Sequence, residues 1–131
     1  MSKQGGEMPI FTKSYDFLAW LLPLSDHVPR AHRHTVTRRL LDAALDFQEL
    51  LVEANNLRGQ ARLHRLNDAN AQLEKMRFYL RLAHHWHWIN PGQYEHAGRL
   101  VAELGRLLGG WQKITRQQPA SPNEAVVVGT G

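Results

Sequence analysis

Apolar residues recur along this chain at alternating spacings of three and four, the period of an amphipathic α-helix. One run of this kind consists of Val36, Leu40, Ala43, Phe47, Leu50 and Ala54. A second consists of Leu66, Ala69, Leu73, Met76, Leu80 and Ala83. A third consists of Tyr94, Ala97, Val101, Leu104, Leu108 and Trp111, and a shorter one of Phe11, Tyr15, Leu18 and Leu22. The pattern predicts four helices, each with one buried face, and no stretch shows the alternation of a strand.

The positions of proline limit where these helices can run. Pro23 is expected to kink or end the first helix, and residues 25–29 then form a connection. The roughly sixty residues between Pro29 and Pro91 contain no proline, and Asn and Gly within 55–59 mark a turn. The third helix is then expected to span roughly 28 residues, or about 40 Å.

The start of the fourth helix has the clearest local signature. Asn90 can cap the helix, Pro91 suits its first position, and Gln93 completes a capping box. Gly109 and Gly110 are expected to weaken the helix near its end. Short connections favour antiparallel neighbours, so the prediction is an all-α, up-and-down four-helix bundle. The predicted division is a flexible N-terminus over 1–10, the bundle over 11–115 and a disordered tail over 116–131.

Length and composition restrict the class of protein. At 131 residues the chain is the size of one domain with one modest core. No run approaches the roughly 20 apolar residues of a membrane-spanning helix, and the first residues lack the apolar stretch of a signal peptide. The absence of cysteine excludes disulfides and thiolate metal sites. These features favour a cytoplasmic protein.

Positive charge gathers in a few segments. Sixteen Lys and Arg against twelve Asp and Glu give a net charge of +4, and most of the cations are Arg, which suits bidentate phosphate contacts. No carboxylate lies between His27 and Leu41. The candidate binding residues are Arg30, Arg33, Arg38, Arg39, Arg58, Arg62, Arg65, Lys75, Arg77 and Arg81. For any one of them a solvated helix face is an equally good interpretation, and it is the clustering that favours binding of a polyanion.

One face of the third helix is predicted to place cations beside aromatic rings. Its members are Arg77, Arg81, His84 and Trp88. A cation beside a ring is the arrangement expected where phosphates and unstacked bases are held. The alternative is a solvated face on which an arginine rests against the tryptophan.

The fourth helix has more than one unusual face. Its charged residues recur at four, four and three, which predicts ion pairs along one narrow stripe. They are Glu95, Arg99, Glu103 and Arg106. Another face has almost no side-chain bulk and consists of Gly98, Ala102, Gly105 and Gly109. This small-residue face predicts the close approach of another helix, from the next subunit of a homo-oligomer or, as the alternative, from the same subunit.

No constellation of residues for catalysis or metal binding is complete. His84 and His87 lie one helical turn apart, but no HExxH pattern or nearby carboxylate completes a metal site. The acids are spread along outward-facing stripes instead of converging on a cleft. No glycine-rich phosphate loop follows a strand. We therefore predict no catalytic residue, no metal ligand and no cofactor, and expect that the protein is not an enzyme.

Several short motifs together carry a resemblance to a known family. They are Tyr15 with Leu21, Leu22 and Pro23; Pro29, Arg30 and Arg33; Glu53, Ala54 and Asn55; LEKMRFYLRL at 73–82; QYE at 93–95; and GRLLGGW at 105–111. Over about 11–113 the chain resembles the accessory variability determinant (Avd) family of diversity-generating retroelements. It departs from the family at 35–37, where a glycine commonly follows the second arginine, and in the tail beyond Arg116.

The resemblance implies a four-helix bundle that assembles as a barrel-like homopentamer. It implies a basic surface that binds the element's reverse transcriptase and its template RNA or DNA. The family supports the copying of template-repeat RNA into adenine-mutagenised cDNA that diversifies a target gene, while the catalysis belongs to the polymerase. The positions that match the family's basic residues are Arg30, Arg33, Arg77 and Arg81, whereas Arg58, Arg62 and Arg65 rest on charge alone.

Two other interpretations stay open at this stage. The related bundle family encoded in intervening sequences of ribosomal RNA genes looks similar in fold and has no settled function. A purely structural bundle would have no nucleic-acid role at all. The sequence also leaves open which nucleic acid is bound, which surface meets the polymerase, how many subunits assemble and what the C-terminal tail does.

Overall fold

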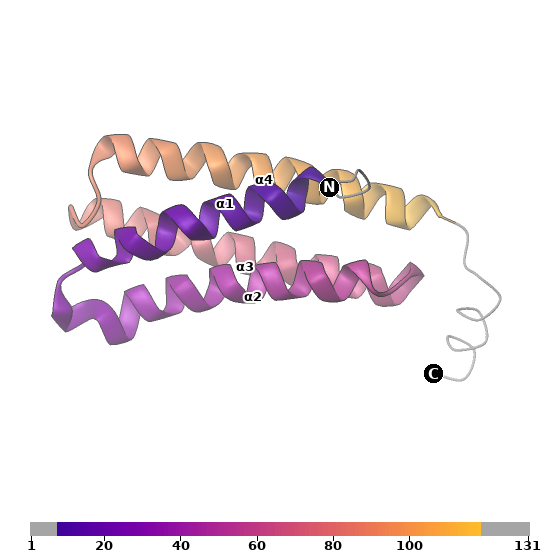
Figure 1. The fold of residues 1–131 in the computed structure, drawn as a ribbon, viewed down its shortest axis with the longest axis horizontal. Helices are drawn as coiled ribbons and strands as arrows, with labels where there is room; N and C mark the ends of the chain where they lie inside the picture. Colours follow the sequence, from indigo (N-terminus) through magenta and orange to yellow (C-terminus); the bar gives the residue numbers. More distant parts are fainter. Residues whose placement is uncertain (1–7, 119–131) are drawn as a thin grey trace.

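Four long helices run alternately up and down in the computed structural model, which describes residues 8–118. They are α1 (Pro9–Leu24), α2 (Arg38–Asn55), α3 (Gly59–His85) and α4 (Pro91–Gln117). Neighbouring helices in space are also neighbours in sequence, with α4 closing the ring against α1 (Figure 1). No strand occurs within residues 8–118, and the predicted up-and-down bundle is confirmed. The predicted bounds of the flexible N-terminus (1–10) and the disordered tail (116–131) are wrong where the structure describes them, because residues 9–10 belong to α1 and residues 116–117 to α4. The predictions for 1–7 and 119–131 lie outside the described residues.

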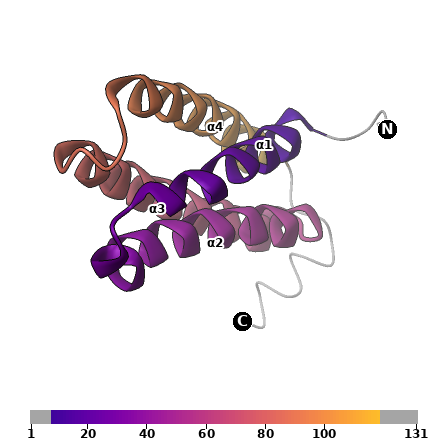
Figure 2. The ribbon, with the colours of Figure 1, turned by 60° about the vertical axis from the view of Figure 1, so that its left-hand side comes forward.

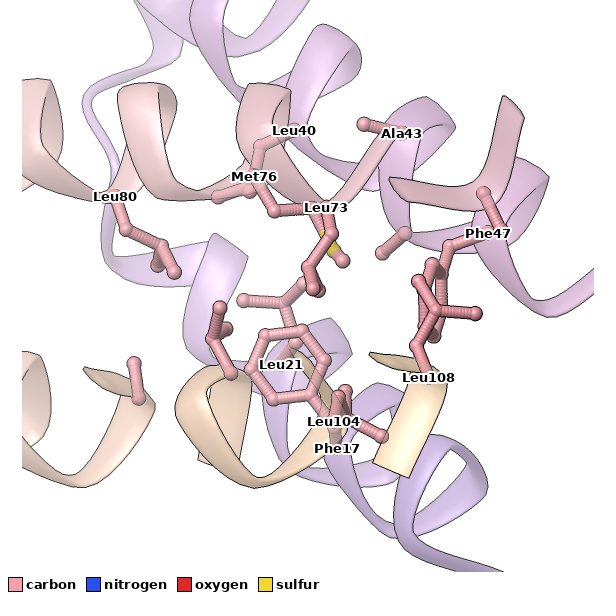
Figure 3. Packing of buried hydrophobic residues seen from close by; sticks show 14 of the residues in the cluster. Phe17, Leu21, Leu40, Ala43, Phe47, Leu73, Met76, Leu80, Leu104 and Leu108 are labelled. Atoms are coloured by element: carbon pink, nitrogen blue, oxygen red, sulfur yellow. The ribbon is translucent and has the colours of Figure 1, made fainter. Parts of the chain in front are cut away.

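The bundle has one continuous core built from the inner faces of all four helices. All six residues of the apolar seam predicted for α3 are buried. The predicted seams of α2 and α4 are buried too, except for Val36, Leu50 and Tyr94, which are half-buried. Figure 3 shows the centre of this core, where Phe17 and Leu21 meet side chains of the other three helices. Removal of these apolar faces from water is the main stabilising contribution to the fold.

The face predicted to be buried on α1 is wrong by one residue. The buried side chains are Ile10, Ser14, Phe17, Leu21 and Leu24. Tyr15 and Leu22, which were predicted to be buried, are 68% and 45% exposed. The inner face includes a serine, so the apolar pattern alone favoured the neighbouring stripe. Ser14 can be buried because its hydroxyl hydrogen-bonds to the Phe11 carbonyl at 3.1 Å and to the side chain of Gln48 on α2.

The C-terminal end of α3 also differs from the prediction, because the helix ends at His85 instead of continuing toward Asn90. The backbone N–H of Trp88 donates to the Ala83 carbonyl at 2.9 Å, and the N–H of His87 donates to the His84 carbonyl at 3.0 Å. This pair of hydrogen bonds is the Schellman motif, which reverses the chain through one left-handed residue. That residue is His87, with a φ of 61°.

The predicted capping box at the start of α4 is confirmed. The Gln93 N–H donates to Asn90 Oδ1 at 2.7 Å, and the Asn90 N–H donates to Gln93 Oε1 at 2.8 Å. The predicted weakening at Gly109 and Gly110 is wrong, since α4 continues without a break to Gln117. The apolar residues on both sides of the glycine pair, including Trp111, are buried in the core and hold the helix in place.

The connection between α1 and α2 is longer and more irregular than the others. Pro23 lies in the last turn of α1, and two 3₁₀ turns, Ser25–His27 and Arg30–His32, follow. A π-helical turn at Arg33–Thr37 then leads into α2. Val28 is buried in this connection, which fixes it against the end of the bundle. Single π-helical turns are uncommon and often occur at functional sites.

Candidate nucleic-acid interface

The cations predicted to bind do not form a single surface. Arg30, Arg33, Arg38 and Arg39 lie in the α1–α2 connection and the first turn of α2. The second group, Arg58, Arg62 and Arg65, lies at the start of α3, at the other end of the bundle. The two groups are separated by the length of α2 (Figure 1). The third group, Lys75, Arg77 and Arg81, lies on the C-terminal half of α3.

The group at the start of α3 makes contacts within the bundle. Arg62 Nε donates to the Ala54 carbonyl at 2.9 Å, and its guanidinium carbon lies 5.6 Å from the centre of the Trp111 ring. A cation at this place satisfies a carbonyl in the last turn of α2 and interacts favourably with the helix dipole. Arg65 forms an ion pair with Glu53 at 2.9 Å. These two side chains therefore stabilise the α2–α3 corner.

Ion pairing divides the remaining candidates. Arg77 pairs with Glu74 one turn earlier on α3, and Arg38 lies 3.9 Å from Asp42. The others are exposed and have no carboxylate partner within residues 8–118. They are Arg30, Arg33, Arg39, Arg58, Lys75 and Arg81. An unpaired, exposed guanidinium is available for phosphate, whereas a paired one must first leave its partner.

Some unpaired cations nevertheless have acidic neighbours. Arg39 and Lys75 both line a surface depression of about 430 Å³ between α2 and α3, together with Asp42, Asp46 and Glu74. Nearby carboxylates of this kind repel a polyanion. Arg81 likewise lines a groove together with Glu74 and Glu95. By this criterion Arg30 and Arg33 are better placed for phosphate than Arg39, Lys75 or Arg81.

A groove of about 920 Å³ lies between the C-terminal half of α3 and the N-terminal half of α4. Arg77, Phe78 and Arg81 line it from α3. His84 also lines it, and its ring stacks on Tyr94 of α4 with centroids 4.3 Å apart and planes 5° apart. The predicted cation–aromatic face of α3 is therefore present in part.

Trp88 does not belong to that face, which corrects the prediction. Because α3 ends at His85, the chain turns before Trp88 is reached. The Trp88 ring instead lies against His32 from the α1–α2 connection, with centroids 4.7 Å apart. The same turn separates His84 from His87, so these histidines are not one helical turn apart. Within residues 8–118 no three His, Cys, Asp or Glu side chains lie close enough together to hold a metal ion.

The small-residue face of α4 is open for most of its length. A Cβ built on Gly98 or Gly109 would meet nothing within 4 Å. A Cβ on Gly105 would lie 2.8 Å from Arg77 Nη2 and 3.4 Å from Leu73 Cδ2. The alternative of a tight crossing within the subunit therefore accounts for Gly105 only. Gly98 and Ala102 line the α3–α4 groove.

The predicted ion pairs along α4 are confirmed. Arg99 Nη1 lies 2.8 Å from Glu95 Oε1, and Arg106 Nη2 lies 2.7 Å from Glu103 Oε2. The hydrogen bond from Arg106 lowers the pKa of the Glu103 carboxyl below its ordinary value. All four side chains are local to one helix, so this stripe of alternating charge offers little to a polyanion.

These features define an antiparallel four-helix bundle with several unpaired cations and an open face of small residues. The part of the chain that the structure describes contains no helix long and apolar enough to cross a membrane. A family model described as bAvd-like matches residues 8–115. The chain therefore belongs to the bAvd-like family, and the resemblance to Avd proteins is confirmed.

One solved structure similar to this chain comes from Bacteroides thetaiotaomicron, and it is a protein with unknown function from the S23 ribosomal protein family. The two are 21% identical with a TM-score of 0.72, and the match covers 79% of this chain and 98% of that chain. At this identity the similarity shows a shared fold alone. The comparison with curated proteins gave no match.

Proposed function

We propose that this protein is a non-enzymatic accessory protein of a diversity-generating retroelement. It binds the element's reverse transcriptase and its template RNA or cDNA in the cytoplasm, and so supports mutagenic retrohoming. The observation that carries the proposal is membership of the bAvd-like family over nearly all of the bundle. The exposed arginines without carboxylate partners support the nucleic-acid part of it, since bidentate guanidinium contacts suit phosphate.

The proposal includes assembly as a barrel-like homopentamer. Two surfaces support a contact between subunits. Tyr15 and Leu22 form an exposed apolar stripe on α1, and Gly98 and Ala102 leave α4 open to close approach. A ring needs two different surfaces on each subunit, and α1 and α4 supply one each.

The first experiment is co-expression with the reverse transcriptase encoded beside this gene, followed by size-exclusion chromatography at moderate salt. Co-elution as a complex of defined mass is the expected result. Separate elution, or the absence of such a polymerase gene, favours the ribosomal-intervening-sequence relative or a structural scaffold. A scaffold also predicts no retention on template RNA at physiological salt.

A matched pair of variants tests the choice of arginines. The double variant Arg30→Ala, Arg33→Ala removes two unpaired cations, and Arg99→Ala, Arg106→Ala removes two ion-paired ones. For a single strand the slope of log K against log salt falls by about 0.7 for each phosphate that the protein ceases to neutralise, so the first variant lowers it by about 1.4. The second variant is expected to leave the slope nearly unchanged. Equal effects would mean that only the net charge of the protein matters.

A further inference from the structure

One end of the bundle combines exposed rings with unpaired cations. In an up-and-down bundle the α1–α2 and α3–α4 connections lie at the same end, opposite the end where α1 begins and α4 finishes (Figures 1 and 2). The ring contact between His32 and Trp88 joins these two connections directly, at 4.7 Å between centroids. We call Arg30, His32, Arg33, Trp86 and Trp88 the aromatic end.

Trp86 is the most exposed ring of this end. It follows the last residue of α3 and is 60% exposed, and its ring touches only the edge of His85 among the described aromatic contacts, at 5.3 Å. It is also the only exposed large apolar side chain of residues 25–37 and 86–90. A protein partner would be expected to find a broader apolar patch here.

The backbone that presents Trp86 is fixed. The Schellman hydrogen bonds close the turn on one side of it, and the capping box of α4 closes it on the other. His87, beside Trp86, adopts a left-handed φ of 61°, which is unfavourable for a residue with a Cβ. Strain of this kind often occurs where the chain must hold a side chain in a required place.

The cations of this end form no ion pair within residues 8–118, although Asp26 lies in the same connection. Arg33 Nη2 lies 3.5 Å from the backbone carbonyl of Asp26, and neither Arg30 nor Arg33 has a carboxylate partner within residues 8–118. Arg33 is also the first residue of the π-helical turn that leads into α2. The aromatic end therefore places two available guanidinium groups on the connection that touches the Trp86 turn.

We propose that the aromatic end binds single-stranded nucleic acid, with an unpaired base stacked on Trp86 and the adjoining phosphates held by Arg30 and Arg33. This inference rests on the proposed function and names the kind of nucleic acid and the place. A duplex keeps its bases stacked on each other and offers only phosphates and groove edges, so it gains nothing from an exposed ring. A single strand gains from both the ring and the cations.

The test is fluorescence anisotropy of a labelled RNA of about 12 nucleotides, single-stranded or annealed to its complement, at physiological salt. Stacking of one base on an aromatic ring corresponds to a change in affinity of roughly 5- to 150-fold. Trp86→Ala is expected to weaken single-strand binding by at least about 5-fold and to leave duplex binding unchanged. Trp86→Phe, which keeps a ring, is expected to restore most of the affinity.

Ile114→Ala is the matched control. Ile114 is a large exposed apolar side chain near the C-terminal end of α4, at the end of the bundle opposite the aromatic end, and its truncation is expected to leave single-strand binding unchanged. Far-ultraviolet circular dichroism verifies that each variant keeps its helices.

Three outcomes overturn the inference. In the first, Trp86→Ala binds the single strand as tightly as the parent does. In the second, Trp86→Ala loses single-strand and duplex binding equally. In the third, Trp86→Ala no longer co-elutes with the polymerase but still binds the single strand. The last outcome would make this end a protein contact. In the first two, continued co-elution of the parent with the polymerase leaves the proposed function standing. If the parent binds neither strand form and elutes apart from the polymerase, both proposals fail.

Discussion

The open glycines of α4 allow the assembly proposal to be separated from the stability of the subunit. Gly98 and Gly109 lie in the interior of α4, and a Cβ on either would meet nothing within 4 Å in its own chain. Replacing a glycine by alanine in such a position stabilises a helix by about 0.5 to 1 kcal/mol. The double variant Gly98→Ala, Gly109→Ala is therefore expected to raise the free energy of unfolding of the isolated subunit by about 1 to 2 kcal/mol.

The corresponding change in melting temperature can be worked out from the size of the chain. Unfolding entropy is about 2.1 cal/mol/K per residue, so roughly 110 ordered residues give about 0.23 kcal/mol/K. The double variant should then melt about 4 to 9 °C higher than the parent. If α4 also forms the contact between subunits, the two added methyl groups lie in a close helix crossing and weaken it. Light scattering would then report a lower mass for the variant, approaching the 15.0 kDa of one chain.

Gly110→Ala is the control for this experiment. Gly110 is exposed and equally open, but it lies one residue further along α4 and therefore points to a different side of the helix. It should raise stability by about 0.5 to 1 kcal/mol and leave the mass unchanged. A double variant that is more stable and keeps the parent's mass would refute the contact. A double variant less stable than the parent, even as a monomer, would refute the conclusion that these glycines face open space.

Three further predictions concern the fold. His87→Gly should raise the free energy of unfolding by about 1 kcal/mol, because glycine adopts the left-handed φ without strain. Urea denaturation followed by circular dichroism at 222 nm measures this change. A lower midpoint for the variant would show that the imidazole contributes more to stability than the strain costs. Asn90→Ala should cost about 1 kcal/mol in the same assay through loss of the capping box, and an unchanged midpoint would mean that water replaces the cap. Leu73→Ala should lower the free energy of unfolding by about 2 to 5 kcal/mol, because the Leu73 side chain is fully buried. Leu45→Ala, at an exposed position of α2, is the control and should change stability little. Similar losses of stability in both variants would contradict the assignment of the core.

The fold could be predicted where local signals agreed. The seam of α3 is entirely apolar over six positions, and every one of them is buried. The start of α4 needed only three neighbouring residues, because a capping box is a local structure. On α1 the signals disagreed, since the buried face contains Ser14 and the exposed face contains Tyr15 and Leu22. A serine can be a core residue when its hydroxyl is hydrogen-bonded, and Ser14 has two partners, the Phe11 carbonyl of its own helix and Gln48 of α2. The second partner depends on the tertiary fold and is not evident from the apolar pattern.

The candidate site was less accessible to prediction because it depends on contacts between helices. The clustering of arginines was evident, but the contact of Arg62 with Trp111 and its bond to the Ala54 carbonyl join parts of the chain that only the fold brings together. Trp86 was missed because α3 was expected to continue past it.

One signal in the sequence could have located the aromatic end. Six of the eight histidines lie in or beside the α1–α2 and α3–α4 connections, and an up-and-down topology places those connections together.

The position of Arg77 indicates how assembly and nucleic-acid binding divide the surface. Its guanidinium pairs with Glu74 and lies against Gly105, at the edge of the small-residue face. A neighbouring subunit that packs on this face of α4 would cover Arg77, so its charge would be used in the assembly and not for phosphate. Arg30 and Arg33 lie on a connection at the end of the bundle and stay accessible when the sides of the helices are covered. Because helix sides suit packing between subunits and connections suit ligands, we expect Arg77→Ala to change the mass of the assembly and Arg30→Ala, Arg33→Ala to change its affinity for nucleic acid.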